Sequence, residues 1–172
     1  MEPDDHDDSP EEALQGPLLT EPISSLNLGP AITVPIDATL QHTVEVMQHR
    51  HLGCVLVVDR DGILKGIFTE RDLLTRVAGR KLDWTSITVG EFMTADPESL
   101  QRGDGIAWAL NLMSIGGYRH VPLIDDDGRP TGVVSVKDII EFIVDLFPDE
   151  ILNLPPDPRK KPGSDDVGGG AD

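Results

Sequence analysis

Two short motifs in this sequence combine a hydroxyl, a base and an acid at the same spacing. They are Thr69, Arg71 and Asp72, and Ser135, Lys137 and Asp138. At the start of a helix, free backbone N–H groups and a hydroxyl can bind a phosphate, and a base can neutralise its charge. A carboxylate can accept hydrogen bonds from both hydroxyls of a ribose. The chemistry that these residues indicate is therefore recognition of a nucleotide.

The same residues also fit the capping of a helix. A Ser or Thr oxygen accepts from a free backbone N–H, and an acid three residues later complements the positive end of the helix. Capping explains the hydroxyl and the acid, but it does not call for the base between them. Both interpretations stay open, and the two roles are compatible.

The two motifs belong to a longer internal repeat. Asp72 and Asp138 lie 66 positions apart, and the same shift aligns many other residues without a gap. The identical pairs include Met47/Met113, Val55/Val121, Asp59/Asp125, Asp61/Asp127, Gly62/Gly128 and Gly66/Gly132. One supersecondary unit is therefore predicted to occur twice.

Each copy has the pattern of a βαββα unit. In the first copy we expect a strand at 33–36, a helix capped by Asp37, strands at 54–58 and 63–68 around the turn 59–62, and a helix from Thr69. In the second copy we expect a strand at 99–101, a helix from about Asp104, strands at 120–124 and 131–134 around the turn 125–128, and a helix from Ser135.

This pattern predicts a mixed α/β (α+β) fold in which two tandem repeats pack as one pseudo-symmetric module. A single copy is too small to bury a good core by itself, so the copies should pack on each other. We expect an acidic disordered tail at 1–28, the first repeat with a linker at 29–90, the second repeat at 91–147, and a disordered tail rich in Pro and Gly at 148–172.

The repeat resembles a tandem pair of CBS domains, known as a Bateman module, of the free-standing type. Four segments carry the resemblance, which covers residues 31–147: Gly53–Asp59, Gly66–Asp72, Arg119–Asp125 and Gly132–Asp138. Members of this family bind AMP, ADP, ATP or S-adenosylmethionine and regulate a fused domain or a partner protein. Free-standing members tend to form disc-like dimers.

The resemblance also implies roles for the segment that opens the second repeat's first hairpin. The backbone of Arg119, His120, Val121 and Pro122 is expected to face the edge of adenine, and the side chain of Arg119 or His120 to reach the ligand. The first repeat has Gly53 and Cys54 at the positions of Arg119 and His120. We therefore expect the two clefts to differ in affinity.

Composition argues against several other classes of function. The net charge is −17, and residues 1–30 hold eight acids and no Lys or Arg, so no basic face for nucleic acid is predicted. No apolar run approaches the ~20 residues that a membrane span needs. Cys54 is the single cysteine, which excludes an intrachain disulfide. These features predict a soluble cytoplasmic protein without a membrane or nucleic-acid partner.

No catalytic or metal site is predicted. The sequence offers no paired carboxylates, Ser/His/Asp set or activated cysteine with an argued role. His49 and His51, two positions apart on a helix, point in different directions. We therefore expect a regulatory sensor rather than an enzyme, with an adenine nucleotide as ligand and magnesium as an optional companion of that nucleotide. The alternative is a ligand-free scaffold for protein–protein contact.

The last predicted helix suggests self-association. From Asp138 to Phe147 its polar residues, Asp138, Glu141 and Asp145, form one narrow stripe, and apolar residues cover the rest. A helix packed on one core needs an apolar stripe only about 100° wide. We therefore expect a homodimer with self-complementary helix contacts, in addition to an unidentified regulated protein.

Overall fold

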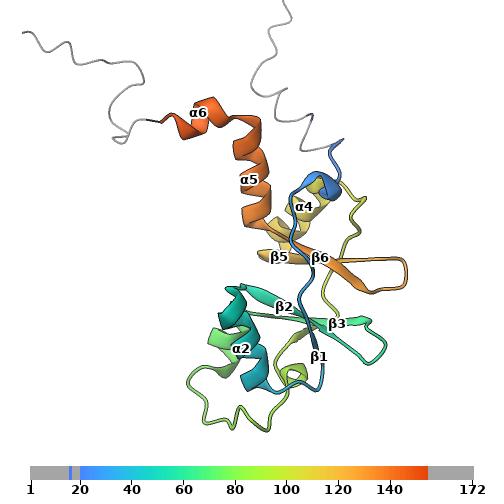
Figure 1. The fold of residues 1–172 in the computed structure, drawn as a ribbon, viewed down its shortest axis with the longest axis vertical. Coiled ribbons are helices and arrows are strands. Elements are labelled where there is room, and N and C mark those ends of the chain that lie inside the picture. The colour runs from blue at the N-terminus through green and yellow to red at the C-terminus, as the bar shows by residue number, and fades with distance from the viewer. Residues whose placement is uncertain (1–15, 17–19, 155–172) are drawn as a thin grey trace, which may run out of the picture. The chain divides into compact units, whose positions relative to one another are not determined.

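The computed structural model describes Gly16 and residues 20–154, and they form a mixed α/β fold, which confirms the predicted class (Figure 1). The chain divides into two compact units, with a boundary between Ile139 and Ile140. Within the described residues, no helix has the length and the apolar composition needed to cross a membrane.

The first repeat contains the predicted βαββα order. Its elements are β1 (Thr33–Pro35), α2 (Leu40–Arg50), β2 (Cys54–Val58), β3 (Leu64–Thr69), the short α3 (Glu70–Asp72) and a π-helical turn, η2 (Leu73–Val77). Strand β1 pairs with β2 in parallel, and β2 pairs with β3 as an antiparallel hairpin. Strand β4 (Thr94–Ala95) then pairs with the outer edge of β3, so the start of the second repeat completes the sheet of the first.

The second repeat has a smaller sheet. Helix α4 (Ile106–Gly116) precedes the antiparallel hairpin of β5 (His120–Ile124) and β6 (Pro130–Ser135), and α5 (Val136–Leu146) follows it. The strand expected at 99–101 is reduced to one parallel bridge between Leu100 and Leu123. Beyond the second repeat, the short α6 (Pro148–Leu152) occupies part of the segment expected to be a tail. The rest of that segment, 155–172, lies outside the described residues.

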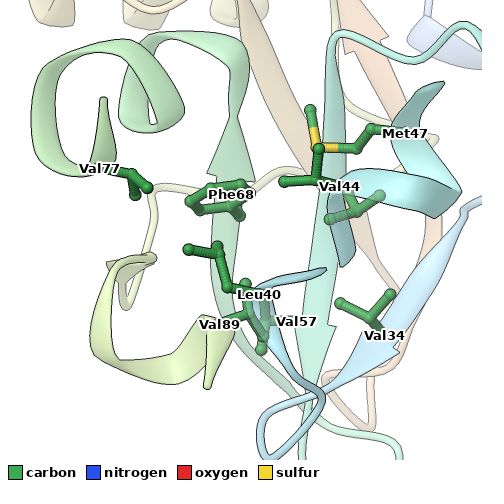
Figure 2. Close-up of a cluster of buried hydrophobic side chains, with 9 residues drawn as sticks. Val34, Leu40, Val44, Met47, Val57, Phe68, Val77 and Val89 are labelled. Carbon is green, nitrogen blue, oxygen red and sulfur yellow. The ribbon is translucent and has the colours of Figure 1, made fainter. Parts of the chain in front are cut away.

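Both faces of the first sheet bury apolar side chains. Leu40, Val44 and Met47 of α2 lie on one face and pack around Phe68, as Figure 2 shows. On the opposite face Cys54, Leu56 and Ile67 pack with Val133 of β6. Because side chains alternate along a strand, a strand buried on both faces is apolar throughout, and β2 reads Cys-Val-Leu-Val-Val.

The two Asp-rich turns are hairpin turns, as predicted. Asp59 Oδ1 accepts from the N–H groups of Asp61 and Ile63 at 3.0 and 2.9 Å, and these bonds, the Ile63 one above all, lower the pKa of Asp59. Asp125 Oδ1 accepts in the same way from Asp127 and Arg129. Gly62 and Gly128 both have φ of +79°, a conformation that glycine adopts without a steric penalty. The turn carboxylates are therefore used to hold the turn.

The predicted boundary of the N-terminal tail at residue 28 differs from the structure. Ile23 is fully buried in the short η1 (Ile23–Ser25), and its N–H donates to Asp104 O at 2.8 Å. Pro22 forms a bridge with Gly105. Two buried residues, Ile23 and Leu26, are too few to produce a sequence period, and the backbone partners of this segment, residues 102–105, lie about 80 residues further along the chain. The remainder of the predicted tail, 1–15 and 17–19, lies outside the described residues.

The predicted helix cap at Asp37 was also wrong. The N-cap of α2 is Thr39, whose Oγ1 accepts from the N–H of His42 at 3.2 Å. The backbone of Thr39 has the extended conformation typical of an N-cap, whereas Asp37 is exposed two residues earlier.

Candidate functional site

The first hydroxyl–base–acid motif lies where β3 ends and α3 begins. Thr69 is the N-cap: its Oγ1 accepts from the N–H of Asp72 at 3.2 Å. In return, Asp72 Oδ2 accepts from Thr69 N at 2.9 Å and from Thr69 Oγ1 at 2.7 Å. This reciprocal arrangement is a capping box. The capping role proposed for this motif is therefore confirmed.

The second motif repeats this geometry between β6 and α5. Asp138 Oδ2 accepts from Ser135 N at 2.7 Å and from Ser135 Oγ at 2.6 Å, and the N–H of Asp138 donates to Ser135 Oγ at 3.3 Å. The base is exposed in both motifs, at Arg71 and at Lys137. The capping boxes themselves use the hydroxyl and the acid of each motif, and both bases line the clefts described next.

The first cleft, which we call cleft 1, has a volume of about 350 Å³ and contains the first motif. Its lining combines the motif with the linker and with the start of β5: Gly53, Ile67, Thr69, Arg71, Asp72, Thr75, Arg76, Thr94–Glu98, Gly116 and Tyr118–His120. Arg71 Nη1 also donates to Gly117 O at 2.9 Å, so this side chain reaches across to the second repeat.

The second cleft, cleft 2, has a volume of about 510 Å³ and contains the second motif. Its lining is Pro30, Ile32, His51–Cys54, Glu70, Arg119, His120, Val133 and Ser135–Asp138. Both volumes are within the range of small-molecule pockets in proteins. Gly53, Arg119 and His120 line both clefts, so the pair of clefts shares one wall.

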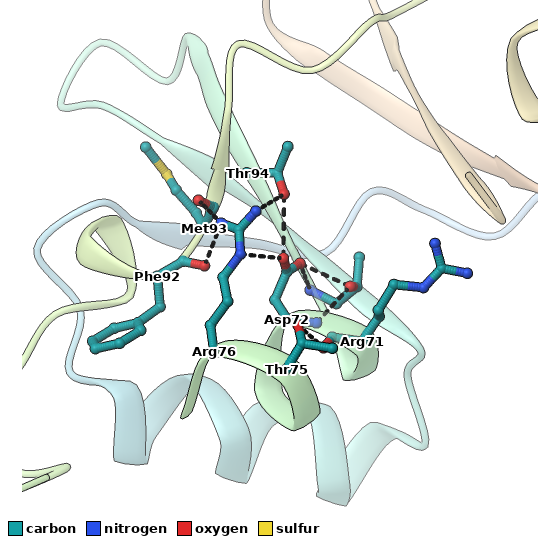
Figure 3. A network of polar contacts seen from close by, with 8 residues as sticks. Arg71, Asp72, Thr75, Arg76, Phe92, Met93 and Thr94 are labelled. Atoms are coloured by element: carbon teal, nitrogen blue, oxygen red, sulfur yellow. Dashed lines mark hydrogen bonds and ion pairs between the residues drawn. The ribbon is translucent and has the colours of Figure 1, made fainter. Parts of the chain in front are cut away.

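Asp72 has further partners that the sequence did not indicate. Figure 3 shows that Arg76 and Thr94 also contact its carboxylate. Thr94 comes from β4, which the predicted order of strands did not include. The internal repeat gave no indication of this role, because the residue 66 positions before Thr94 is Leu28, which is apolar.

The structure brings eight of the ten predicted binding residues to the clefts. The other two, Val121 and Pro122, are buried in β5 and line neither cleft. The carbonyl of Pro122 already accepts from Leu100 N at 3.0 Å, and Val121 pairs with Val134. Both residues therefore support the strand that carries Arg119 and His120.

His120 lies against the backbone of the first repeat. A Cβ placed on Gly53 would come within 3.0 Å of His120 Nε2, so the imidazole occupies the space that a side chain at position 53 would need. Burial, together with the nearby Arg119, lowers the pKa of His120, although Glu70 and Asp138 act in the opposite direction. Burial also raises the pKa of Cys54 to about 12, with help from Asp138 and Glu70, so Cys54 remains a neutral thiol.

The lowered pKa of His120 leads to a prediction about stability and pH. The unfolded chain, in which His titrates at about 6.5, takes up a proton at a higher pH than the native protein. The stability that neutral His120 provides is thus complete above about pH 6.5 and is lost as pH falls towards the native pKa. His120→Gln should therefore lose less unfolding free energy between pH 7.5 and pH 5.5 than the natural chain does in urea titrations.

The matched control for this pH experiment is His42→Gln, at an exposed position on α2. This variant should keep the pH dependence of the natural chain. Equal slopes for the natural chain and His120→Gln would show that His120 does not contribute.

Comparison with known proteins identifies the repeat. The model of the CBS domain family matches residues 23–79 and 89–145, which together cover more than half of the chain. Both matches begin at a buried residue, Ile23 and Val89. The first match therefore includes the segment around η1, which was predicted to be part of the tail.

Two curated relatives illustrate where such pairs occur. An uncharacterized 17.7 kDa protein of Acidianus ambivalens is 27% identical over 124 residues, which cover 72% of this chain and 74% of that protein. The meiotically up-regulated gene 70 protein of Schizosaccharomyces pombe is 31% identical over 121 residues, 70% of this chain but only 17% of that protein. The pair therefore matches most of the first relative and a small part of the second.

Solved structures agree with the fold. A CBS-domain-containing protein from Agrobacterium tumefaciens matches with a TM-score of 0.63 at 30% identity, over 71% of this chain and 98% of that one. A CBS domain pair in complex with 5′-methylthioadenosine and S-adenosylmethionine matches with a TM-score of 0.61 at 25% identity, over 67% and 94%. CBSX2 in complex with AMP shares the fold with a TM-score of 0.61 at 17% identity, over 73% of this chain and 97% of that one. This chain belongs to the CBS-domain family and contains two CBS domains in tandem.

Proposed function

We propose that this protein is a regulatory module that binds an adenine nucleotide in the clefts between its two CBS domains and signals to a partner protein. The observation that carries the proposal is the duplication of the site. Two hydroxyl–base–acid motifs open helices at the edges of two clefts, and both clefts share Arg119 and His120. Helix capping alone does not explain why both copies of the motif line a cleft.

Each residue type has a role in this proposal. The carboxylates of Asp72 and Asp138 would accept hydrogen bonds from ribose hydroxyls. Arg71 and Lys137 would pair with phosphate, and Arg119 and His120 would lie beside the base. The complex of a related CBS pair with S-adenosylmethionine and 5′-methylthioadenosine supports a ligand that contains adenosine. Magnesium would arrive with the phosphates of ATP, since the described residues hold no cluster of three acidic, His or Cys side chains for a metal.

The proposed activity is regulatory rather than catalytic, in a cytoplasmic setting. The hydroxyls of Thr69 and Ser135, which line the clefts, donate to the aspartates of the capping boxes. Their hydrogen bonds thus stabilise the starts of the two helices. Cys54, the one candidate nucleophile of its type, has a pKa of about 12 and stays protonated near neutral pH. Ligand binding would therefore act by changing which surfaces a partner protein can contact.

We also propose that the protein forms a homodimer through helices of its second repeat. On α4, Trp108 and Ile115 are 63% and 80% exposed, and on α5 Ile140 is 54% exposed. The positions that correspond to Trp108 and Ile115 in the first repeat are His42 and His49. Among the described residues of the two repeats, the exposed large apolar side chains other than Leu74 lie in the second repeat, and such a concentration is typical of an interface.

The alternative function, a scaffold without a ligand, rests on the same exposed apolar residues. It requires dimerisation but no nucleotide. The two hypotheses differ in one measurable property, because only the first predicts that a small ligand stabilises the chain.

A thermal shift panel tests the proposed ligand. AMP, ADP, ATP, S-adenosylmethionine and cyclic dinucleotides would each be added to the full chain. A ligand that binds only the folded state at ten times its dissociation constant adds about 1.4 kcal/mol to the unfolding free energy, and the melting temperature rises accordingly. Guanosine and cytidine nucleotides serve as controls for charge. A flat melting temperature across the panel at millimolar ligand would leave the scaffold hypothesis.

A further inference from the structure

The two carboxylates proposed to hold ribose do not have the same surroundings. Asp72, only 6% exposed, receives four hydrogen bonds or ion pairs, shared between its two oxygens. Oδ2 accepts from Thr69, as in the capping box. Oδ1 accepts from Thr94 Oγ1 at 3.2 Å and pairs with Arg76 Nε at 3.3 Å. A carboxylate offers about four acceptor positions, so the acceptor capacity of Asp72 is fully used.

The guanidinium of Arg76 is itself held from several sides, as Figure 3 shows. Nη1 donates to Met93 O at 2.8 Å and to Phe92 O at 3.2 Å, and Nη2 donates to Thr94 Oγ1 at 3.3 Å. The planar fork of an Arg side chain suits such a set of acceptors. Arg76 thus ties Asp72 to the segment 92–94, and we call this network the Arg76 clamp.

The second repeat lacks this clamp. Asp138 Oδ2 accepts from Ser135, but within residues 20–154 the structure shows no donor for Asp138 Oδ1. The counterparts of Arg76 and Thr94 in the 66-residue repeat are Phe142 and Leu28, whose side chains have no hydrogen-bond donor. The difference between the two carboxylates is therefore encoded in the residues at these positions.

We infer that the Arg76 clamp makes the clefts unequal, so that cleft 2 takes the ribose of the first nucleotide and cleft 1 binds ribose only weakly. This inference rests on the proposed nucleotide function. A ribose diol at Asp138 can use Oδ1, to which no described residue donates, whereas a diol at Asp72 must first displace Thr94 or Arg76. Breaking a charge-assisted contact of Asp72 costs free energy, and the new hydrogen bonds to ribose only offset that cost. The net gain in binding free energy at cleft 1 is therefore small. Arg76 is thus a positioning residue that sets the number of ligands bound.

Calorimetric titration with adenosine tests this inference on the full chain. Adenosine has no phosphate, so the bases of the two motifs do not complicate the comparison. The natural chain should bind one adenosine tightly and a second at least about tenfold more weakly. Asp138→Ala should remove the tight site. In the natural chain, 2′-deoxyadenosine, which lacks one hydroxyl of the diol, should bind the tight site at least about tenfold more weakly than adenosine does.

Release of the clamp should then create a second strong site. Arg76→Met should raise the adenosine affinity of cleft 1 about tenfold, so that two ligands bind in the same concentration range. Thr94→Val removes one donor to Asp72, keeps the side-chain shape and should act in the same direction if Arg76→Met fails to fold. Arg80→Met, at an exposed position outside both cleft linings, is the matched control and should leave one tight site.

Two results would overturn this inference and leave nucleotide binding intact. One is a natural chain that binds two adenosines with equal affinity, and the other is a tight site that Asp72→Ala, not Asp138→Ala, removes. A natural chain that binds no adenosine, AMP or S-adenosylmethionine would overturn the proposed function, and this inference with it.

Discussion

Asp138→Ala is expected to weaken AMP binding about 10- to 100-fold and to leave the weak binding of free adenine almost unchanged. The proposed carboxylate contact is with the ribose hydroxyls, and hydrogen bonds to a charged group contribute about 1.5–3 kcal/mol. Adenine has no ribose, so it loses nothing when the carboxylate is removed. Equilibrium titrations of both ligands, with circular dichroism on each protein, measure this difference.

A second substitution in the same motif separates the role of phosphate from that of ribose. Lys137→Ala should weaken ADP and ATP more than adenosine, and it should reduce the dependence of their binding on salt, because the side chain is proposed to pair with phosphate. Asp145→Ala, exposed two turns later on α5, is the matched control and should change neither ligand. Equal losses for all ligands would instead indicate damage to the start of the helix.

Ile140→Asp is expected to convert a dimer of the full chain into a monomer at micromolar concentration. The natural side chain is 54% exposed, so the substitution should not disturb the fold of the chain itself. In a symmetric interface each copy contributes the same residue, so one substitution places two buried charges in the dimer. Light scattering gives the mass directly, and Phe142→Asp should have the same effect if the interface follows α5.

The control for the dimer is His42→Asp, which adds the same acid at an exposed position of the first repeat. This variant should remain a dimer. A monomer mass for the natural chain would contradict the proposed dimer, and a dimer that survives Ile140→Asp and Phe142→Asp would place the interface away from α5. The full chain should be used, because Ile23 is buried and removal of residues up to 28 would expose its partners.

Local patterns were sufficient to predict most of the secondary structure. Leu40, Val44 and Met47 repeat with the period of a helix, and they are the buried apolar residues of α2 that pack on the first sheet. The two Asp-Gly turns predicted both hairpins, since glycine alone adopts their positive φ easily. The 66-residue repeat predicted that each motif would open a helix, and the capping boxes at Thr69 and Ser135 agree. Such features depend on residues close together in the chain.

Contacts between distant segments could not be predicted in the same way. The N–H of the buried Ile23 donates to Asp104 O, about 80 residues away, and β4 pairs with β3 through two residue pairs only, too few to produce a pattern. Val121 and Pro122 were expected at the ligand, yet both are buried, because the middle of β5 is covered on both of its faces.

The amino-acid sequence by itself was sufficient to indicate the family, the duplicated motif and the polar groups that could bind a nucleotide. The tertiary structure decided which of these groups share a cleft and which are already occupied. Asp72 and Asp138 have the same place in the repeat, but only Asp72 contacts Thr94 of β4 and Arg76, and Arg76 also donates to the backbone carbonyls of residues 92 and 93. A carboxylate's capacity to bind depends on the donors that surround it in space, and those donors come from segments that sequence spacing does not connect.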